Sequence, residues 1–203
     1  MKKSILALMM ALVLMMMPVL SMAETAFQTY THTNDQYTVQ YPANWILLNA
    51  ENITSIMEMM DTSEDEQLAQ MISAYGPQVQ QLDMVMIINE TGLTNVNLVC
   101  QEVGMNLNGE QLMSMAPALV SQLSNSMAGI QFVDEGSLID VNGTESLKMA
   151  YVMEVAGAQM CGVQVYIPGS TAIYIVTYTC NNADELEATR EDFNAMLGTL
   201  VVK

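Results

Sequence analysis

The stretch YTVQYPANW, residues 37–45, is typical of a β-strand that alternates apolar and polar side chains and then stops at a proline. Pro42 cannot donate a hydrogen bond to a neighbouring strand, so we expect the strand to end there. Trp45, the single tryptophan of the chain, is then expected to fold back as a large apolar plug over one end of the core.

The residues before this strand predict its partner. The segment 27–41 contains two alternating runs around Asn34 and Asp35, residues that tolerate the positive φ of a tight turn. With a two-residue turn, His32 faces Tyr37 and Tyr30 faces Val39. A structural role is therefore expected for His32, the only histidine.

The remaining sequence predicts a regular alternation of helices and strands. Amphipathic helices are expected over 50–60 and from Ser63 to Tyr75, where Gly76-Pro77 stops the second. Strands follow over 84–88 and 95–103. Another helix is expected from Asn108 to about residue 127, with a kink or a late start at Pro117.

The second half predicts a meander of strands and a closing helix. Asn142-Gly143 is a strong hairpin signal, and the segments 161–167 and 172–180 flank a PGST turn that pairs Ile167 with Ala172. A last helix is expected between Asn182 and Gly198. The predicted fold class is α+β, an antiparallel β-sheet sandwiched by helices in an α/β/α arrangement.

The N-terminal segment indicates export. Residues 1–23 contain Lys2 and Lys3, then an apolar run, then small residues at 21 and 23, which is typical of a secretory signal peptide. Residues 24–203 are expected to form one domain. No cysteine follows the apolar run, so we expect no stable membrane anchor and a soluble, secreted or extracytoplasmic protein.

The charge of the exported chain is strongly negative. Lys148, Arg190 and Lys203 are its three lysine or arginine side chains against 22 carboxylates, a formal charge of −19. Such a surface repels phosphate backbones and anionic lipids, so nucleic-acid partners are excluded, whereas cations and basic partners are favoured.

Two groups of acidic residues are candidate metal ligands, for calcium or manganese. The first is the run DTSEDE, with Asp61, Glu64, Asp65 and Glu66, which lacks the glycine and the alternating spacing of an EF-hand loop. Carboxylates that complement a helix dipole are the alternative explanation. The second is the pair Asp140 and Glu145, which the Asn142-Gly143 turn places opposite each other; a cation or an outward splay would relieve their repulsion.

Three cysteines remain after the apolar segment: Cys100, Cys161 and Cys180. With the register above, Cys161 faces Tyr178 and is only a diagonal neighbour of Cys180, beyond comfortable disulfide reach. A shift of the register by two would place the two cysteines directly opposite. Both a Cys161–Cys180 bridge and buried thiols therefore stay open.

Catalytic motifs are not evident. His32 has no serine or cysteine motif around it, and the sequence contains no glycine-rich phosphate loop, HExxH or CxxC pattern. A hydrolase would require His32 to lie in a cleft beside a nucleophile. No catalytic and no cofactor-binding residue is predicted.

Taken together, the YPANW corner, the strand AIYIVTYTC (172–180) and the closing helix DFNAMLGTL (192–200) resemble the PsbP-like superfamily, which includes PsbP, the Ran-binding Mog proteins and DcrB-type envelope proteins. The resemblance implies a non-enzymatic accessory or binding domain with a protein or small-molecule partner. It carries over no catalytic residue. The second functional hypothesis is an acidic protein that binds calcium or manganese, and the third is a hydrolase.

Overall fold

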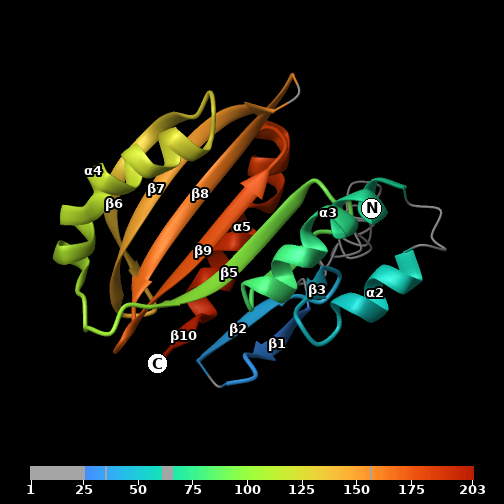
Figure 1. The fold of residues 1–203 in the computed structure, drawn as a ribbon, viewed down its shortest axis with the longest axis horizontal. Coiled ribbons are helices and arrows are strands. Elements are labelled where there is room, and N and C mark those ends of the chain that lie inside the picture. Colours follow the sequence, from blue (N-terminus) through green and yellow to red (C-terminus); the bar gives the residue numbers. More distant parts are fainter. Residues whose placement is uncertain (1–25, 35, 61–65, 156) are drawn as a thin grey trace, which may run out of the picture.

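The structure is a computed structural model, and it describes residues 26–34, 36–60, 66–155 and 157–203. The described chain contains a large seven-stranded sheet of order β3-β4-β5-β9-β8-β7-β6 and a small three-stranded sheet of order β1-β2-β10. All strand pairs among these residues are antiparallel. The α+β class with helices packed on an antiparallel sheet is therefore confirmed (Figure 1).

The N-terminal hairpin belongs to the small sheet. Strands β1 (Phe27–Thr31) and β2 (Tyr37–Pro42) pair in the predicted register, with Tyr30 opposite Val39, and the C-terminal strand β10 (Val201–Val202) adds to the other edge of β2. The Trp45 N–H donates to the Pro42 carbonyl at 3.0 Å, which closes the turn after the strand. Trp45 is only 5% exposed and lies in the main core, as the sequence predicts.

The next segment forms one edge of the large sheet and two helices that pack on it. Strand β3 (Ile46–Leu48) is followed by helices α2 (Ile53–Met60) and α3 (Glu66–Gln81), then by β4 (Val85–Ile88). The prediction that Gly76-Pro77 stops the second helix is wrong, because α3 continues through both residues. A Cβ on Gly76 would lie 2.8 Å from the Met57 sulfur. This close approach of α2, together with the burial of Val79, holds the last turn helical despite Pro77.

The large sheet continues from β5 (Thr94–Glu102) into the meander β6 (Gln131–Val141), β7 (Thr144–Val155), β8 (Ala158–Pro168) and β9 (Ala172–Cys180). The β6–β7 register is the predicted one, with Asp140 opposite Glu145 around Asn142-Gly143. The predicted β8–β9 register is wrong. Ile167 pairs with Tyr174 rather than Ala172, because Gly169 donates to the Ala172 carbonyl and closes a tighter turn.

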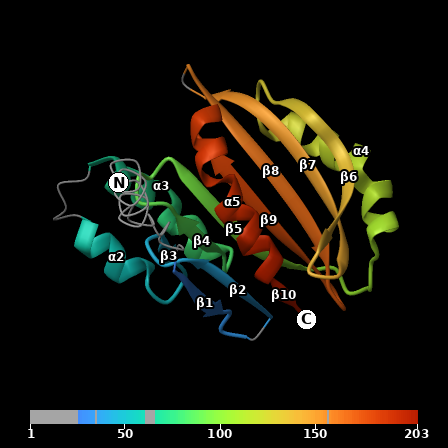
Figure 2. The ribbon, with the colours of Figure 1, turned by 180° about the vertical axis from the view of Figure 1, so that it is seen from behind.

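Two helices cover opposite faces of the meander (Figures 1 and 2). Helix α4 (Gly109–Ser126) starts directly after the Asn108 cap, so Pro117 does not delay it. It covers one face through Leu112 and Ala116. Helix α5 (Ala183–Thr199) begins after Asn182 and packs on the other face. Within the described residues, no helix is both long and apolar enough to cross a membrane.

Edge strand β6 contains irregularities in its pairing with β7 between Phe132 and Ser137. The Asp134 carboxylate holds this region: it accepts from the Gly136 N–H at 3.1 Å and the Ser137 hydroxyl at 2.7 Å, and it lies 3.3 Å from the Lys148 ammonium. Burial alone would raise the pKa of Asp134, but these partners lower it below its usual value. The irregular pairing also discourages another chain from extending the sheet at this edge.

This arrangement predicts an acid-dependent part of the stability. Because the pKa of Asp134 is lower in the folded than in the unfolded chain, its contribution is present above the unfolded pKa of about 3.9 and is lost as the pH falls through the folded value. Urea unfolding should therefore show a steeper loss of stability below about pH 4 for the wild type than for Asp134→Asn. Parallel pH profiles for the two proteins would contradict this assignment.

Candidate functional site

A cleft of about 330 Å³ opens between helix α4 and the sheet. The helix packs mainly on β6, β7 and β8, so the neighbouring faces of β9 and β5 are left beside it (Figure 1). The walls of the cleft are largely apolar. These side chains come from the helix, from β9 and from the residue that follows β5: Val103, Leu112, Met115, Leu119, Leu123, Ile173 and Ile175. Its volume is within the range of small-molecule sites.

Local sequence patterns explain how these side chains reach the cleft. Residues of one parity in β9 face α5, and those of the other parity, including Ile173 and Ile175, face α4. On α4, Leu112, Met115, Leu119 and Leu123 recur at helical spacing and line one side of the helix. The cleft therefore forms where an amphipathic helix meets a sheet that is apolar on both faces.

The polar side chains of the cleft are neutral. They are Gln101, Gln122, Gln164 and Tyr166. The Tyr166 hydroxyl donates to Gln164 Oε1 at 2.7 Å, and Gln164 Nε2 donates to the Thr177 hydroxyl at 3.2 Å. Burial raises the pKa of Tyr166 to about 12, so the phenol stays protonated at neutral pH. The network holds Gln164 in one orientation on the cleft floor.

The strand register places Gln164 in a row of polar residues across three strands. Gln164 pairs with Thr177, and Thr177 pairs with Asn97 on its other side. Among the described residues, the buried Asn97 Oδ1 atom has no hydrogen-bond partner. A buried carbonyl oxygen without a partner is uncommon in folded proteins.

The cleft offers apolar surface and a few neutral hydrogen-bonding groups. Among the described residues that line it, none is a carboxylate, histidine, cysteine, lysine or arginine. The lining therefore suits an uncharged molecule that buries apolar surface and exchanges a few hydrogen bonds with amides and a phenol.

The predicted acidic sites are placed only in part. Asp61, Glu64 and Asp65 lie outside the described residues, and Glu66 opens α3 with a side chain that is also outside them. Asp140 accepts from the Gly143 N–H at 3.0 Å within the turn, whereas Glu145 lies against Gly109 at the start of α4. The carboxylates of Asp140 and Glu145 therefore contact different parts of the chain, although the two residues are paired in the ladder. No group of three or more potential metal ligands occurs in the described part of the chain, and cation binding stays a prediction.

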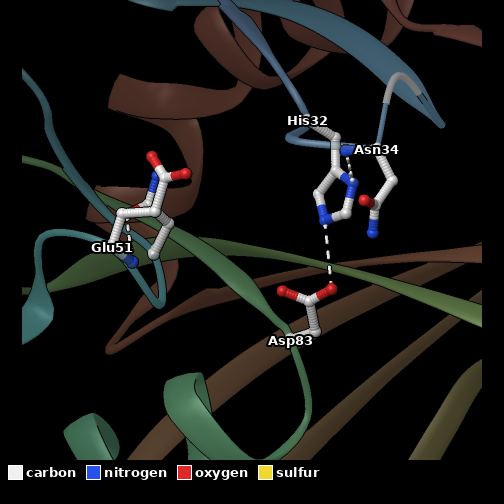
Figure 3. Close-up of polar contacts among 5 residues, drawn as sticks. His32, Asn34, Glu51 and Asp83 are labelled. Carbon is white, nitrogen blue, oxygen red and sulfur yellow. Dashed lines mark hydrogen bonds and ion pairs between the residues drawn. The ribbon is translucent and has the colours of Figure 1, made fainter.

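His32 lies in a structural contact between two turns (Figure 3). Its ring is 3% exposed and stacks on Tyr37 with centroids 4.9 Å apart. Nδ1 accepts from the Asn34 N–H at 3.4 Å, and Nε2 lies 3.5 Å from a carboxylate oxygen of Asp83, in the turn after α3. In the same view (Figure 3), the Glu51 N–H donates to Asn49 Oδ1 at 3.1 Å. The His32 ring thus contacts an aromatic side chain, a backbone N–H and a carboxylate.

The sequence-based reasoning did not identify the cleft residues. One signal was present: Gln164 interrupts the face of β8 that carries Tyr166, opposite a face made of Val163, Val165 and Ile167. A polar residue in a strand with two otherwise apolar faces needs a partner. The sequence alone does not show that the helix 109–126 leaves this position uncovered.

Comparison with known proteins decides the family. A family model described as PsbP-like protein matches residues 20–199. The chain belongs to the PsbP-like family. The resemblance noted in the sequence is thereby confirmed, and a search of curated proteins finds no matching sequence.

Solved structures show the same PsbP-like fold at low sequence identity. Cyanobacterial PsbP (CyanoP) from Synechocystis sp. PCC 6803 is 13% identical with a TM-score of 0.56, over 90% of this chain and 96% of that one. LpqN of Mycobacterium tuberculosis, described as involved in cell envelope biogenesis, is 13% identical with a TM-score of 0.52, over 88% and 91%.

A third structure, from Bacteroides thetaiotaomicron VPI-5482, is 8% identical with a TM-score of 0.53 over 87% of this chain. The present chain spans about half of that protein, 48% of its length. At these identities the likeness concerns the fold.

Proposed function

We propose that this PsbP-like protein is a non-enzymatic, extracytoplasmic binding domain that holds an uncharged, largely apolar small molecule in the cleft beneath α4. The observation that carries the proposal is the composition of the cleft: none of the described residues lining it is charged, although the chain contains 22 carboxylates. Apolar walls with a few neutral hydrogen-bonding groups favour an uncharged ligand, because a bare charge there would lose its hydration.

Other features support this function. The signal-like segment 1–23 favours export. Membership of the PsbP-like family supports an accessory or binding role. LpqN, which has the same fold, is described as acting in cell envelope biogenesis, in keeping with an extracytoplasmic location.

A charge placed in the cleft should weaken binding. Met115 lines the cleft and is 40% exposed, so Met115→Glu adds a carboxylate to the wall with little expected effect on folding. The probe is N-phenyl-1-naphthylamine, an uncharged apolar fluorophore whose emission rises in apolar sites. We expect the wild type to enhance its fluorescence and Met115→Glu to weaken binding by about tenfold or more, a change of about 1.4 kcal/mol.

Met113 provides the matched control. It lies on the same helix and is 38% exposed, but it is not among the residues that line the cleft. Met113→Glu should therefore bind the fluorophore within about twofold of the wild type. A wild-type protein that does not enhance the fluorescence would overturn the proposal, and so would equal losses in the two variants. Thermal melts of both variants establish that each is folded.

A further inference from the structure

The β8–β9 register places two buried cysteines side by side. Cys161 and Cys180 are direct partners in the antiparallel ladder, and both side chains lie on the sheet face that packs against α5. Directly opposite residues have Cα atoms about 4.5–5.5 Å apart, inside the 4.4–6.8 Å range that a disulfide requires. In the structure both are thiols, and the Cys180 S–H donates to the Cys161 carbonyl at 3.7 Å.

The third cysteine lies too far away to compete. Cys100 pairs with Tyr174 across the β5–β9 ladder, on the same strand β9 that carries Cys180. Cys180 lies six steps along the strand from Tyr174, which corresponds to about 20 Å. The geometry therefore selects one pair and leaves Cys100 as the odd thiol.

The core around the pair determines when oxidation is able to occur. Cys180 is 0% and Cys161 9% exposed. Burial raises the pKa of Cys180 to about 12, so the reactive thiolate is scarce once the protein has folded. Oxidation is thus expected during folding, before the core closes. A bridge formed in this way would be shielded from reductants by the same core.

We propose that Cys161 and Cys180 form a disulfide when the chain folds in an oxidising environment, and that Cys100 stays a thiol. The oxidant is a disulfide such as oxidised glutathione. One cysteine thiolate attacks it and releases a first glutathione thiol, and the second cysteine attacks the mixed disulfide and releases the other. Two protons and two electrons pass from the protein thiols to glutathione. The proposal is independent of the cleft.

The test counts thiols after refolding. The full chain is unfolded with reductant, refolded in a glutathione buffer or in reductant alone, and then alkylated with iodoacetamide in denaturant. We expect one alkylated cysteine in the oxidised sample and three in the reduced one, measured by intact mass. Chymotryptic cleavage after Tyr166 and Tyr174 separates Cys161 from Cys180, so the bridge appears as two linked peptides.

Stability and variants provide further readouts. A bridge that closes a loop of about 20 residues should raise the Tm of the oxidised protein by roughly 5–10 °C. Cys100→Ser should keep the bridge and contain no alkylated cysteine. After the same oxidative refolding, Cys161→Ser should contain two alkylated cysteines and should not show the increase in Tm. Three alkylated cysteines after oxidative refolding of the wild type, or a linked peptide that contains Cys100, would overturn the proposal. Both results are measured on the wild-type protein, so the test does not depend on whether Cys161→Ser folds.

Discussion

Truncation of Tyr178 to alanine is expected to lower the free energy of unfolding by about 4 kcal/mol, a large part of the 5–15 kcal/mol of a typical domain. Tyr178 is 0% exposed and lies on β9, in the middle of the large sheet. Its ring stacks on Phe193 of α5 with centroids 4.6 Å apart and planes inclined by 20°. The alanine variant would leave a ring-sized cavity where the helix meets the sheet.

Tyr178→Phe separates the ring from its hydroxyl. The Tyr178 and Thr189 hydroxyl oxygens are 2.6 Å apart, and Thr189 itself donates to the Glu185 carbonyl at 2.7 Å. Because Thr189 keeps that bond, loss of the phenol should cost only about 1 kcal/mol. Equilibrium urea unfolding of the three proteins gives the comparison. A cost below about 1.5 kcal/mol for the alanine variant would contradict the packing of α5 on this face.

The second large loss of stability is expected when a methyl group is added at Gly162. Gly162 pairs with Tyr151 across the β7–β8 ladder, and a Cβ there would overlap the Tyr151 ring and lie 2.8 Å from its hydroxyl oxygen. The ring is 3% exposed and packs edge-on against Phe132 at 6.0 Å, so it has little room to move. Gly162→Ala should therefore cost roughly 2–3 kcal/mol.

The same substitution at Gly198 should have the opposite sign. Gly198 lies near the end of α5, and a Cβ there meets no other atom within 4 Å. Alanine is favoured over glycine in helices, so Gly198→Ala should stabilise the protein by up to about 1 kcal/mol. Urea unfolding of both variants decides the matter. If Gly162→Ala is as stable as the wild type, the Tyr151 ring does not lie across the glycine.

These scaffold predictions are distinct from the binding prediction. Tyr178 faces α5, on the side of the sheet opposite the α4 cleft. Met115 is a partly exposed residue of the cleft wall and is not among the buried core residues. A variant that loses stability but binds the fluorophore when folded, and one that folds but does not bind it, would therefore report on different parts of the molecule.

The features that depend on neighbouring residues were predictable from the sequence. The His32–Tyr37 contact and the Asp140–Glu145 register follow from two short turns, because the length of a turn fixes which residues face each other. Asn108 caps its helix with the reciprocal contact to Gln111, which is another local arrangement. Burial of Trp45 was also predicted, since a strand that ends at proline frees the chain to turn back.

The features that depend on residues far apart in the sequence were not predictable from it. The β8–β9 turn is tighter than the PGST sequence suggests because it is held from outside: the Thr171 carbonyl accepts from Val103 and Gly104, and the Ser170 N–H donates to the Lys203 carbonyl. That single difference brings Cys161 opposite Cys180. Similarly, α3 passes through Pro77 because α2 packs on it.

The sequence by itself thus determined most of the strands and the capped helices, the registers of the β1–β2 and β6–β7 hairpins, the acidic charge and the PsbP-like family. Only the tertiary structure decided the cysteine pair, the separate neighbours of Asp140 and Glu145, and the cleft beneath α4. The physical reason is the range of the interactions. Side-chain alternation and capping act over a few residues, whereas a cleft depends on which strands a helix leaves uncovered when the whole core packs.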